Sequence, residues 1–297
     1  MNRKFVLDTV RKARAELSAE SLIASLNVHD PSDISIEDIA MTRGALVVEG
    51  GLSGAEARLT RSPKLSFIRV NSGIREPGRK RFGIAHEIGH LELHREPGSL
   101  TICTQGNVVL FHSSDQKEIE ANHFAAALLM PETMFAPQCR ASSPSLDLVS
   151  HLASRFRVSL TAACSRYLQF CPHRCCMVLS TEGRIRYHRK TEDFGYFLQP
   201  SDELRSTSYA ADLFAGDSIP AGMRSAPASA WLEGARIDSS KRILEESISM
   251  PSYESVLTLL WIDKDIDAYV IGDDEAEAEQ AASDSRWSWN RYRRDTD

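Results

Sequence analysis

The feature that most constrains this chain is the segment RFGIAHEIGHLELH at residues 81–94. Its histidines, His86 and His90, are four residues apart, and Glu87 follows the first of them. On an α-helix such a pair lies on one face, with about 5–6 Å between Cβ atoms, so both imidazoles can reach the same ion. Apolar residues fill most of the remaining positions, which indicates a largely buried helix.

Two imidazoles on one helical face are typical of zinc sites, where Zn–N bonds are about 2.0–2.1 Å long. A carboxylate beside the first histidine can take a proton from a water that zinc has acidified, and this is the chemistry of the H-E-x-x-H motif. We therefore predict that His86 and His90 bind zinc and that Glu87 is the general base. The alternative is a buried helix whose two histidine rings are merely hydrogen-bonded, so the interpretation depends on a third ligand.

The helix expected at residues 115–130, DQKEIEANHFAAALLM, offers that ligand. Glu118 and Asn122 are four residues apart and share a face. Glu118 can therefore complete the zinc site while Asn122 hydrogen-bonds a ligating histidine. Glu120 and His123 are the alternative ligands on this helix, although Glu120 is expected to point elsewhere.

Length and composition indicate a soluble protein with more than one domain. The chain has 297 residues, of which 42% are hydrophobic and 26% charged, and its net charge of −6 argues against general polyanion binding. No apolar run is long enough to cross a bilayer, and the charged N-terminus lacks the apolar stretch of a secretory signal. We therefore expect a cytoplasmic protein whose six cysteines are thiols or metal ligands.

The order of the expected elements predicts an α+β fold. Residues 1–140 combine helices with short strands at 44–73 and would form a zincin-like zinc metallopeptidase domain. Residues 141–175 indicate a helical linker of two helices. Short strand-like pieces predict a mixed α/β domain at 176–272, and an acidic and aromatic tail follows at 273–297.

Local patterns add further expectations. Ser32 or Asp33 is expected to cap the short helix SDISIEDIAM, and residues 98–117 are expected to be irregular apart from a strand at NVVLFH. The strand LSFIRVN at 65–71 could present an edge on which a substrate peptide docks. The CPHRCC segment at 171–176 lacks the distant second pair of zinc knuckles, so we interpret it as a junction with a partly buried thiol cluster.

Taken together, the two metal-binding segments resemble a family signature. RFGIAHEIGHLELH followed by EIEANHFAAALLMP is similar to the signature pair of the ImmA/IrrE metallopeptidase family, over roughly residues 40–135. Members of this family are zinc-dependent endopeptidases that cut a partner transcriptional repressor of the helix-turn-helix type. By position, the resemblance implies that His86, His90 and Glu118 are the zinc ligands. It also implies that Glu87 is the general base.

The resemblance extends to what surrounds the peptidase. In the family, a helix-turn-helix-like pair follows the peptidase domain, and several members end in a GAF-like sensor domain. The helices expected at 145–169 and the strands at 176–272 are compatible with both. A basic face formed by Arg155, Arg157 and Arg166 leaves DNA contact open. A sensor for single-stranded DNA or a small molecule also remains open.

Cys103 is a candidate for control of the site. It lies thirteen residues after His90, in the segment SLTICTQGN that leads toward Glu118. A thiolate is a good zinc ligand, so Cys103 in the fourth position would displace the catalytic water and hold the enzyme inactive. The CapP-type branch of the family, tied to anti-phage defence, is described by such a switch. The alternative is that Cys103 is a small apolar loop residue.

His94 and His112 are nearby candidates for stabilising the oxyanion.

These observations predict a cytoplasmic zinc metalloendopeptidase. It would cleave a cognate helix-turn-helix repressor to derepress DNA-damage or phage-defence genes, and it would stay latent until a signal such as single-stranded DNA arrives. Two alternatives remain open. One is a DNA-binding transcriptional regulator with a structural zinc, in which Glu87 would be dispensable. The other is a peptidase that acts on a toxin-antitoxin partner.

Overall fold

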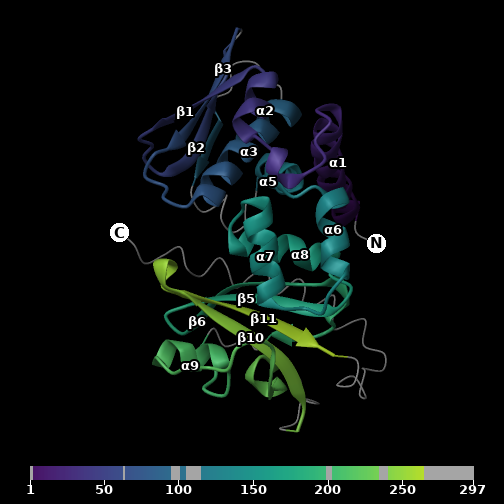
Figure 1. The fold of residues 1–297 in the computed structure, drawn as a ribbon, viewed down its shortest axis with the longest axis vertical. Coiled ribbons are helices and arrows are strands. Elements are labelled where there is room, and N and C mark those ends of the chain that lie inside the picture. Colours follow the sequence, from purple (N-terminus) through teal and green to yellow (C-terminus); the bar gives the residue numbers. More distant parts are fainter. Residues whose placement is uncertain are drawn as a thin grey trace. The chain divides into compact units, whose positions relative to one another are not determined.

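The computed structural model describes residues 3–62, 64–94, 101–104, 115–198, 203–233 and 240–263. Residues Met1–Ile262 form one compact unit, which we call the first unit. Every element described below belongs to the first unit (Figure 1). The described part of the chain is mixed α+β, as predicted, with eight α-helices, a four-stranded sheet, a five-stranded sheet and one two-stranded pairing. None of the helices described combines the length and apolar character that a membrane span requires.

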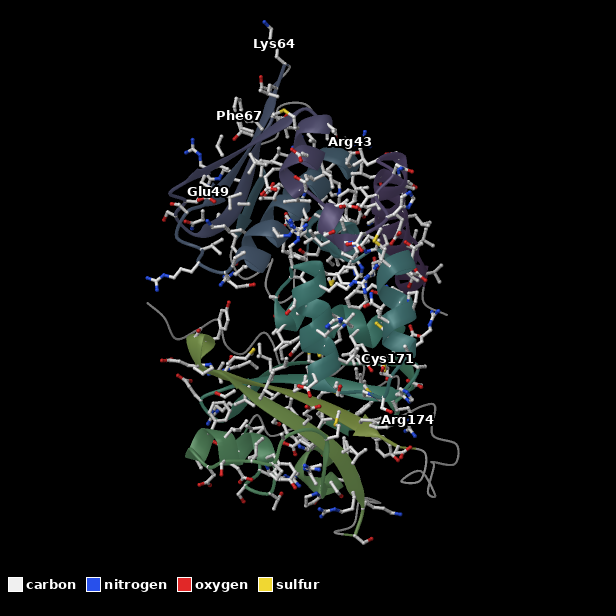
Figure 2. All side chains as sticks on the ribbon, in the orientation of Figure 1. Arg43, Glu49, Lys64, Phe67, Cys171 and Arg174 are labelled. Atoms are coloured by element: carbon white, nitrogen blue, oxygen red, sulfur yellow. The ribbon has the colours of Figure 1, made fainter. Side chains whose placement is uncertain are left out.

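The first sheet supports the helix that carries the histidines. Its strands, in chain order, are β1 (Ala45–Gly50), β2 (Ala55–Thr60), β3 (Ser66–Asn71) and β4 (Thr101–Thr104). They lie in the order β1-β3-β2-β4, with β1 and β3 parallel and the other pairs antiparallel. Buried and exposed residues alternate along β3: Ile68 and Val70 are buried, while Phe67 is exposed (Figure 2). One face of the sheet therefore packs against helices and the other meets solvent.

Two expectations about this sheet are wrong. The LSFIRVN strand, β3, lies between β1 and β2, so its ladder is filled and it offers no edge to a substrate peptide. Residues 98–117 are not simply irregular, because β4 forms within them and pairs with β2. The strand expected at NVVLFH lies outside the described residues. Strand order is set by contacts distant in sequence, which local patterns do not encode.

The N-terminal helices are α1 (Arg3–Ser25) and α2 (Ile36–Thr42). The cap of α2 is Ser35, whose hydroxyl accepts the backbone N–H of Asp38. The expected caps, Ser32 and Asp33, instead lie in a preceding 3-10 turn. The correction moves the helix start by a few residues, because serines and aspartates in succession offer several equivalent capping oxygens.

The metal-binding segments form the two helices α3 (Pro77–Leu93) and α5 (Gln116–Leu129). Pro77 occupies the first turn of α3, where its missing N–H costs nothing. The two helices pack directly against each other. Gly89 permits this close approach, since a Cβ there would lie 3.2 Å from the Cα and carbonyl oxygen of Ala121 on α5. The HEIGH sequence therefore contributes to packing as well as to chemistry.

Three further helices follow: α6 (Glu132–Arg140), α7 (Leu146–Phe156) and α8 (Leu160–Phe170). The pair α7 and α8 was expected, with its joint near Val158. The helix α6 was not, because Pro137 within it argues against a helix. The hydrophobic core runs from α1 through α8 into the second sheet without a break, so the domain borders expected near residues 140 and 175 stay predictions.

The three arginines of α7 and α8 do not form the expected basic face. Arg166 is buried and donates to Glu16 of α1 at 2.9 Å. Arg157 adopts a left-handed conformation, with φ of 54°, and its guanidinium donates to the carbonyl of Ile34 at 2.9 Å. Arg155 donates to Gln138 of α6, because its Nη1 lies 3.1 Å from the amide oxygen Oε1. These side chains join helices within the fold.

The second sheet is antiparallel and takes up the C-terminal part of the described chain. Its strands are β5 (Arg174–Thr181), β6 (Arg184–Lys190), β8 (Arg224–Pro227), β10 (Arg242–Met250) and β11 (Ser255–Ile262), in the order β6-β5-β11-β10-β8. A separate pairing joins β7 (Phe197–Leu198) to β9 (Leu232–Glu233). The helix α9 (Tyr209–Ala215) was not expected. Figure 1 shows α8 and α9 on opposite faces of this sheet, and the central strand β11 is buried almost throughout.

A buried carboxylate secures α9 and its neighbourhood. Glu245 on β10 is fully buried and accepts the backbone N–H of Ala210 at 2.9 Å and the indole N–H of Trp231 at 2.7 Å. Burial raises the pKa of Glu245 above its ordinary value in spite of these donors. Trp231 is itself fully buried, so it belongs to the core.

The first turn of α3 lies against the joint between α7 and α8. A Cβ on Gly78 would lie 2.7 Å from the backbone nitrogen of Ser159 and from the carbonyl carbon of Val158. Backbone atoms cannot move aside as a flexible side chain can. The packing of α3 against the start of α8 therefore requires glycine at position 78.

We predict that Gly78→Ala lowers the free energy of unfolding by about 1–3 kcal/mol, because the added methyl forces the two helices apart. Gly51→Ala is the matched control: none of the described residues has an atom within 4 Å of its Cβ position, so its stability should stay within about 0.5 kcal/mol of the parent. Urea unfolding measures both. Equal stability of the two variants would show that the α3–α8 contact is not tight.

Candidate metal centre

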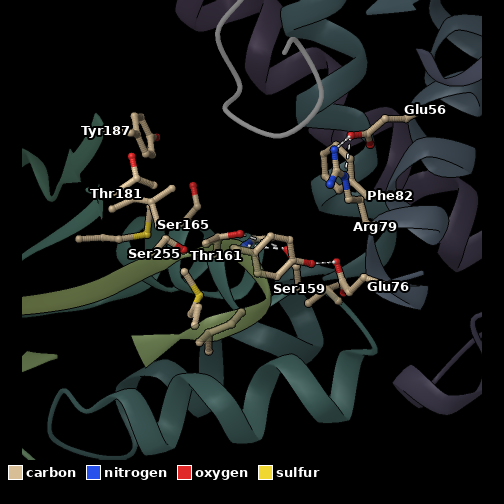
Figure 3. A pocket seen from close by; sticks show the side chains of 17 residues that line it. Glu56, Glu76, Arg79, Phe82, Ser159, Thr161, Ser165, Thr181, Tyr187 and Ser255 are labelled. Carbon is tan, nitrogen blue, oxygen red and sulfur yellow. Dashed lines mark hydrogen bonds and ion pairs between the residues drawn. The ribbon is translucent and has the colours of Figure 1, made fainter. Parts of the chain in front are cut away.

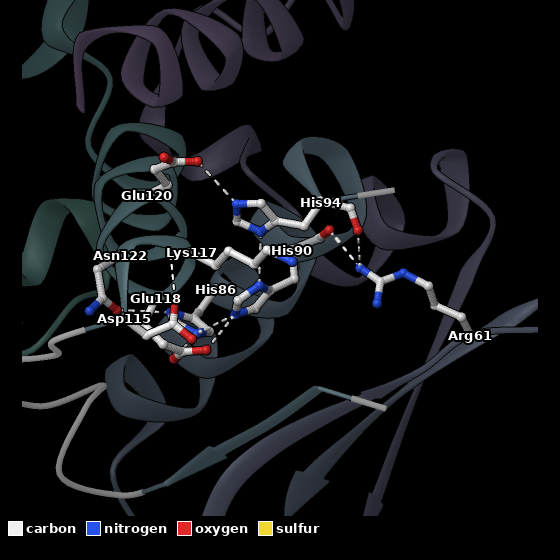
Figure 4. Close-up of polar contacts among 9 residues, drawn as sticks. All are labelled: Arg61, His86, His90, His94, Asp115, Lys117, Glu118, Glu120 and Asn122. Carbon is white, nitrogen blue, oxygen red and sulfur yellow. Dashed lines mark hydrogen bonds and ion pairs between the residues drawn. The ribbon is translucent and has the colours of Figure 1, made fainter. Parts of the chain in front are cut away.

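Three side chains from two helices converge on one point (Figure 4). The Nε2 atom of His86 lies 3.2 Å from Oε2 of Glu118, and Nε2 of His90 lies 3.1 Å from Oε1 of the same carboxylate. The two Nε2 atoms are 3.1 Å apart. All three residues are buried. Within the described residues, this is the group of histidine, cysteine and acidic side chains whose ligand atoms are close enough to hold a metal ion.

The spacing suits a single divalent cation. Around a tetrahedral ion with bonds of about 2.0–2.1 Å, neighbouring ligand atoms lie about 3.3–3.4 Å apart, close to the observed distances. Two imidazole nitrogens and one carboxylate oxygen are a donor set that zinc accepts. His86, His90 and Glu118 therefore fit a bound zinc ion without rearrangement of either helix.

Protons are distributed unevenly over these groups. Burial lowers the pKa of His90 to about 4. Burial also acts to lower the pKa of His86, but its hydrogen bond with Glu118 outweighs this, and the pKa lies above the ordinary histidine value. Burial acts to raise the pKa of Glu118, yet hydrogen bonds with both histidines hold it well below its usual range. A carboxylate that stays charged in a buried position is well suited to meet a cation.

Asn122 orients the first histidine. Its Oδ1 lies 2.8 Å from Nδ1 of His86, and both side chains are buried. When Nδ1–H donates to this amide oxygen, Nε2 keeps its lone pair and directs it toward Glu118. Asn122, one turn after Glu118 on α5, therefore lies beside the ring of His86.

A second chain of contacts reaches His90 and was not foreseen. Nδ1 of His90 lies 3.0 Å from Nδ1 of His94, and Nε2 of His94 lies 3.1 Å from Oε2 of Glu120 (Figure 4). If Nδ1–H of His90 donates to His94, the remaining proton of His94 is on Nε2 and donates to Glu120. Nε2 of His90 then carries a lone pair that can bind a metal. Arg11 of α1 lies 3.9 Å from the other oxygen of Glu120.

The contacts from His90 through His94 to Glu120 change two assignments made from the sequence. Glu120, considered as an alternative metal ligand that points elsewhere, points to His94. His94, considered for the oxyanion, instead contacts the ring of His90. The sequence did carry the signal, because His94 continues the four-residue spacing of His86 and His90 along one face of α3.

The end of α3 is fixed by Arg61, which follows β2. Its guanidinium donates to the carbonyl oxygens of His90 at 2.7 Å and of His94 at 2.9 Å. The carbonyl of His90 also accepts the backbone N–H of His94 at 3.1 Å, whereas the carbonyl of His94 lies at the C-terminal cap, where the helix supplies no further donor. A cation at this position also suits the negative end of the helix dipole. Arg61 thereby ties the backbone beneath both histidines to the sheet.

Glu87 is completely buried next to His86. Its negative charge is among the causes that raise the pKa of His86, so its carboxylate lies near the centre. It is not one of the three residues whose ligand atoms converge. The geometry leaves Glu87 close to the metal position without making it a ligand.

The remaining candidates lie elsewhere. His123 faces α1, with Nδ1 2.7 Å from Oε1 of Glu16, so it is not a ligand. The backbone of Cys103 belongs to β4, at an end of the sheet, and its side chain lies outside what the structure describes. His112 falls outside the described residues altogether.

The thiol cluster expected at CPHRCC forms around the start of β5. The sulfur atoms of Cys171 and Cys175 are 3.8 Å apart, and Cys175 and Cys176 are buried. Burial raises the pKa of Cys176 to about 12, which keeps its thiol protonated and a poor ligand. In the part of the chain that the structure describes, these thiols do not join a second metal-binding group.

We predict that His94→Phe and Asn122→Ala each weaken zinc binding by about 10–100-fold, because each removes the hydrogen bond that orients a histidine. Competition against a chromophoric chelator measures the affinity. His151→Phe, on an exposed position of α7, is the control and should bind zinc as the parent does. Parental affinity in both test variants would mean that these contacts do not support the metal.

A search of solved structures finds a similar fold. The structure described as a Mycobacterium tuberculosis transcriptional regulator aligns with a TM-score of 0.51 and 16% sequence identity, covering 92% of this chain and 100% of that one. At this identity the likeness concerns the fold alone. Among curated proteins, no sequence matches this chain.

The family comparison covers the centre itself. Residues 44–168 match the Peptidase M78 model, which is described as an IrrE N-terminal-like domain. The matched range runs from the start of the first sheet to the end of α8 and contains His86, His90 and Glu118. This match supports the resemblance of residues 44–168 to the ImmA/IrrE family of metallopeptidases.

Proposed function

We propose that this chain is a zinc-dependent endopeptidase with its active site at His86, His90 and Glu118. The observation that carries the proposal is the convergence of two imidazoles from α3 and one carboxylate from α5, with ligand atoms 3.1–3.2 Å apart. Three protein ligands of this kind are typical of catalytic zinc sites, which keep a fourth position for water or substrate. Structural sites fill all four positions with protein.

The chain's own residues then divide the work. Zinc, when bound, supplies Lewis acidity: it polarises a carbonyl and lowers the pKa of water to about 7. Glu87 accepts the proton of the attacking water and can return it to the leaving amine. Asn122 and His94 hold the two histidine rings in place while this happens. Burial of the site keeps competing water away from the reacting groups.

The sheet offers a place for the substrate chain. We propose that an extended peptide adds to β4, since β4 ends the sheet in the described part of the chain while β3 is enclosed. Backbone hydrogen bonds would supply affinity, and alternate side-chain pockets specificity. The register is set by β2, whose Arg58 lies opposite Ile102 of β4.

The family suggests the substrate and the signal. We propose that the substrate is a helix-turn-helix transcriptional repressor, whose cleavage derepresses DNA-damage or phage-defence genes. The likeness in fold to a protein described as a transcriptional regulator is compatible with this. A GAF-like C-terminal domain that senses single-stranded DNA, and a helix-turn-helix-like α7–α8 pair, remain parts of the proposal, as does a cytoplasmic location. A toxin-antitoxin partner is the alternative substrate.

We predict that Glu87→Gln lowers cleavage of the repressor encoded beside this chain by at least about 10²–10⁴-fold, because it removes the general base. Zinc content and thermal stability should stay at parental levels, since the amide keeps the shape of the side chain. Glu132→Gln, at an exposed position, is the control. Cleavage at the parental rate by Glu87→Gln would favour the rival function, a DNA-binding regulator with a structural zinc.

Cys103 provides a separate prediction about latency. If its thiolate occupies the fourth zinc position, Cys103→Ser should cleave the repressor without an inducer, because serine is a much weaker zinc ligand. Cleavage is followed by gel electrophoresis with and without single-stranded DNA. Cys171→Ser, in the thiol cluster near β5, should remain as inactive as the parent. A Cys103→Ser variant that still needs an inducer rules out this switch.

A further inference from the structure

A separate cavity of about 330 Å³ lies apart from the metal centre (Figure 3). Its walls come from β2 and the first half of α3 on one side, and from α8, β5, β6 and the β10–β11 turn on the other. The view shows Glu56, Arg79 and Phe82 on one side and Thr181 and Tyr187 on the other. None of the three converging metal-site residues lines it.

Most of the lining is apolar. Phe82, Leu160, Met177, Leu179 and Met250 contribute to it. Small-molecule sites are concave and largely apolar, with volumes of about 300–1,000 Å³ and a few placed polar groups that fix orientation. The cavity lies at the lower end of this range, which suits a ligand of one or two rings.

Two polar atoms on the wall have no hydrogen-bond partner among the residues that the structure describes. Glu56 is completely buried; its Oε1 accepts from Arg79, with Nε at 2.6 Å, but its Oε2 makes no hydrogen bond. The Oγ of Ser255, a residue that is 5% exposed, makes none either. Buried polar atoms are paired in the great majority of proteins. Both residues line the cavity, so a molecule bound there is a candidate partner for the two atoms.

The polar groups also define the head of that partner. A carboxylate oxygen beside a guanidinium is an acceptor only, so Oε2 of Glu56 requires a donor. Two carboxylates, of Glu56 and Glu76, face one guanidinium, of Arg79, around the cavity. This excess of negative charge favours a cationic head over an anionic one. The apolar lining favours a flat or bulky hydrocarbon body behind the head.

We propose that this cavity binds a small molecule with an aromatic or apolar body and an amidine- or amine-like head whose N–H donates to Oε2 of Glu56. The site is distinct from the metal centre, and the proposal does not depend on peptidase activity. Phe82 lies one turn before His86 on α3. A ligand here would therefore touch the helix that carries the metal site as well as the C-terminal sheet.

The test uses benzamidine as probe and benzoate as its matched control. The two have the same ring and nearly the same shape, but benzamidine offers N–H donors and benzoate only acceptors. Isothermal titration and thermal unfolding of the full chain, with and without a chelator, measure binding. We expect benzamidine to bind and to raise the melting temperature in both conditions, and benzoate to do neither. Equal binding of the two probes, or no binding of benzamidine, overturns the proposal.

Two variants locate the binding. Glu56→Gln should weaken benzamidine at least about tenfold, because it removes the charge from the accepting group. Thr161→Trp leaves the Glu56–Arg79 pair intact and fills the cavity from a partly exposed position, so it should abolish binding, while Thr161→Ser should not. Should Thr161→Trp fold normally and bind benzamidine as the parent does, the probe is bound elsewhere and the assignment is wrong.

Discussion

The close packing of α3 against α5 is the constraint on which the rest of this structure depends. Neither helix can form the centre alone, because two ligands come from α3 and one from α5. The approach is possible because residue 89 is glycine, whose hydrogen faces the backbone of Ala121. A larger residue would separate the ligand nitrogens from the carboxylate of Glu118. The glycine inside the HEIGH sequence is thus a structural requirement of the chemistry.

Because the centre is buried, its polar side chains need hydrogen-bond partners, and the surrounding residues supply them. Buried polar groups are costly unless they are hydrogen-bonded. His86 is held by Asn122, and His90 by His94, which in turn contacts Glu120. Arg61 fixes the last turn of α3 from the side of the sheet. The centre therefore rests on a network that extends from the sheet to α5, and a change in any of these residues should be felt as a change in metal affinity.

Local periodicity predicted the centre better than it predicted the sheet around it. His86, His90 and Glu118 follow from four-residue spacings on two helices, which the chain shows directly. The order of β3 and β4 in the sheet does not follow, because strand neighbours are chosen by contacts far apart in sequence. The helix α6 was not predicted because Pro137 lies within it. The cavity beside Glu56 was not predicted because its lining residues come from segments that precede and follow the metal-binding helices in the sequence. The four-residue spacing of His94 from His90 is visible in the sequence. Its contact with Glu120 could be recognised only once the structure showed where Glu120 lies.

X-ray absorption spectroscopy at the zinc edge of the purified full chain tests the central claim most directly, because it reports which atoms bind the metal. The account predicts one zinc per chain with two imidazole nitrogens and carboxylate oxygen at about 2.0–2.2 Å, and at most one sulfur at about 2.3 Å, from Cys103. A shell with two or more sulfurs would move the metal to the thiol cluster. Such a shell, or a protein that takes up no zinc, would contradict a metal centre at His86, His90 and Glu118.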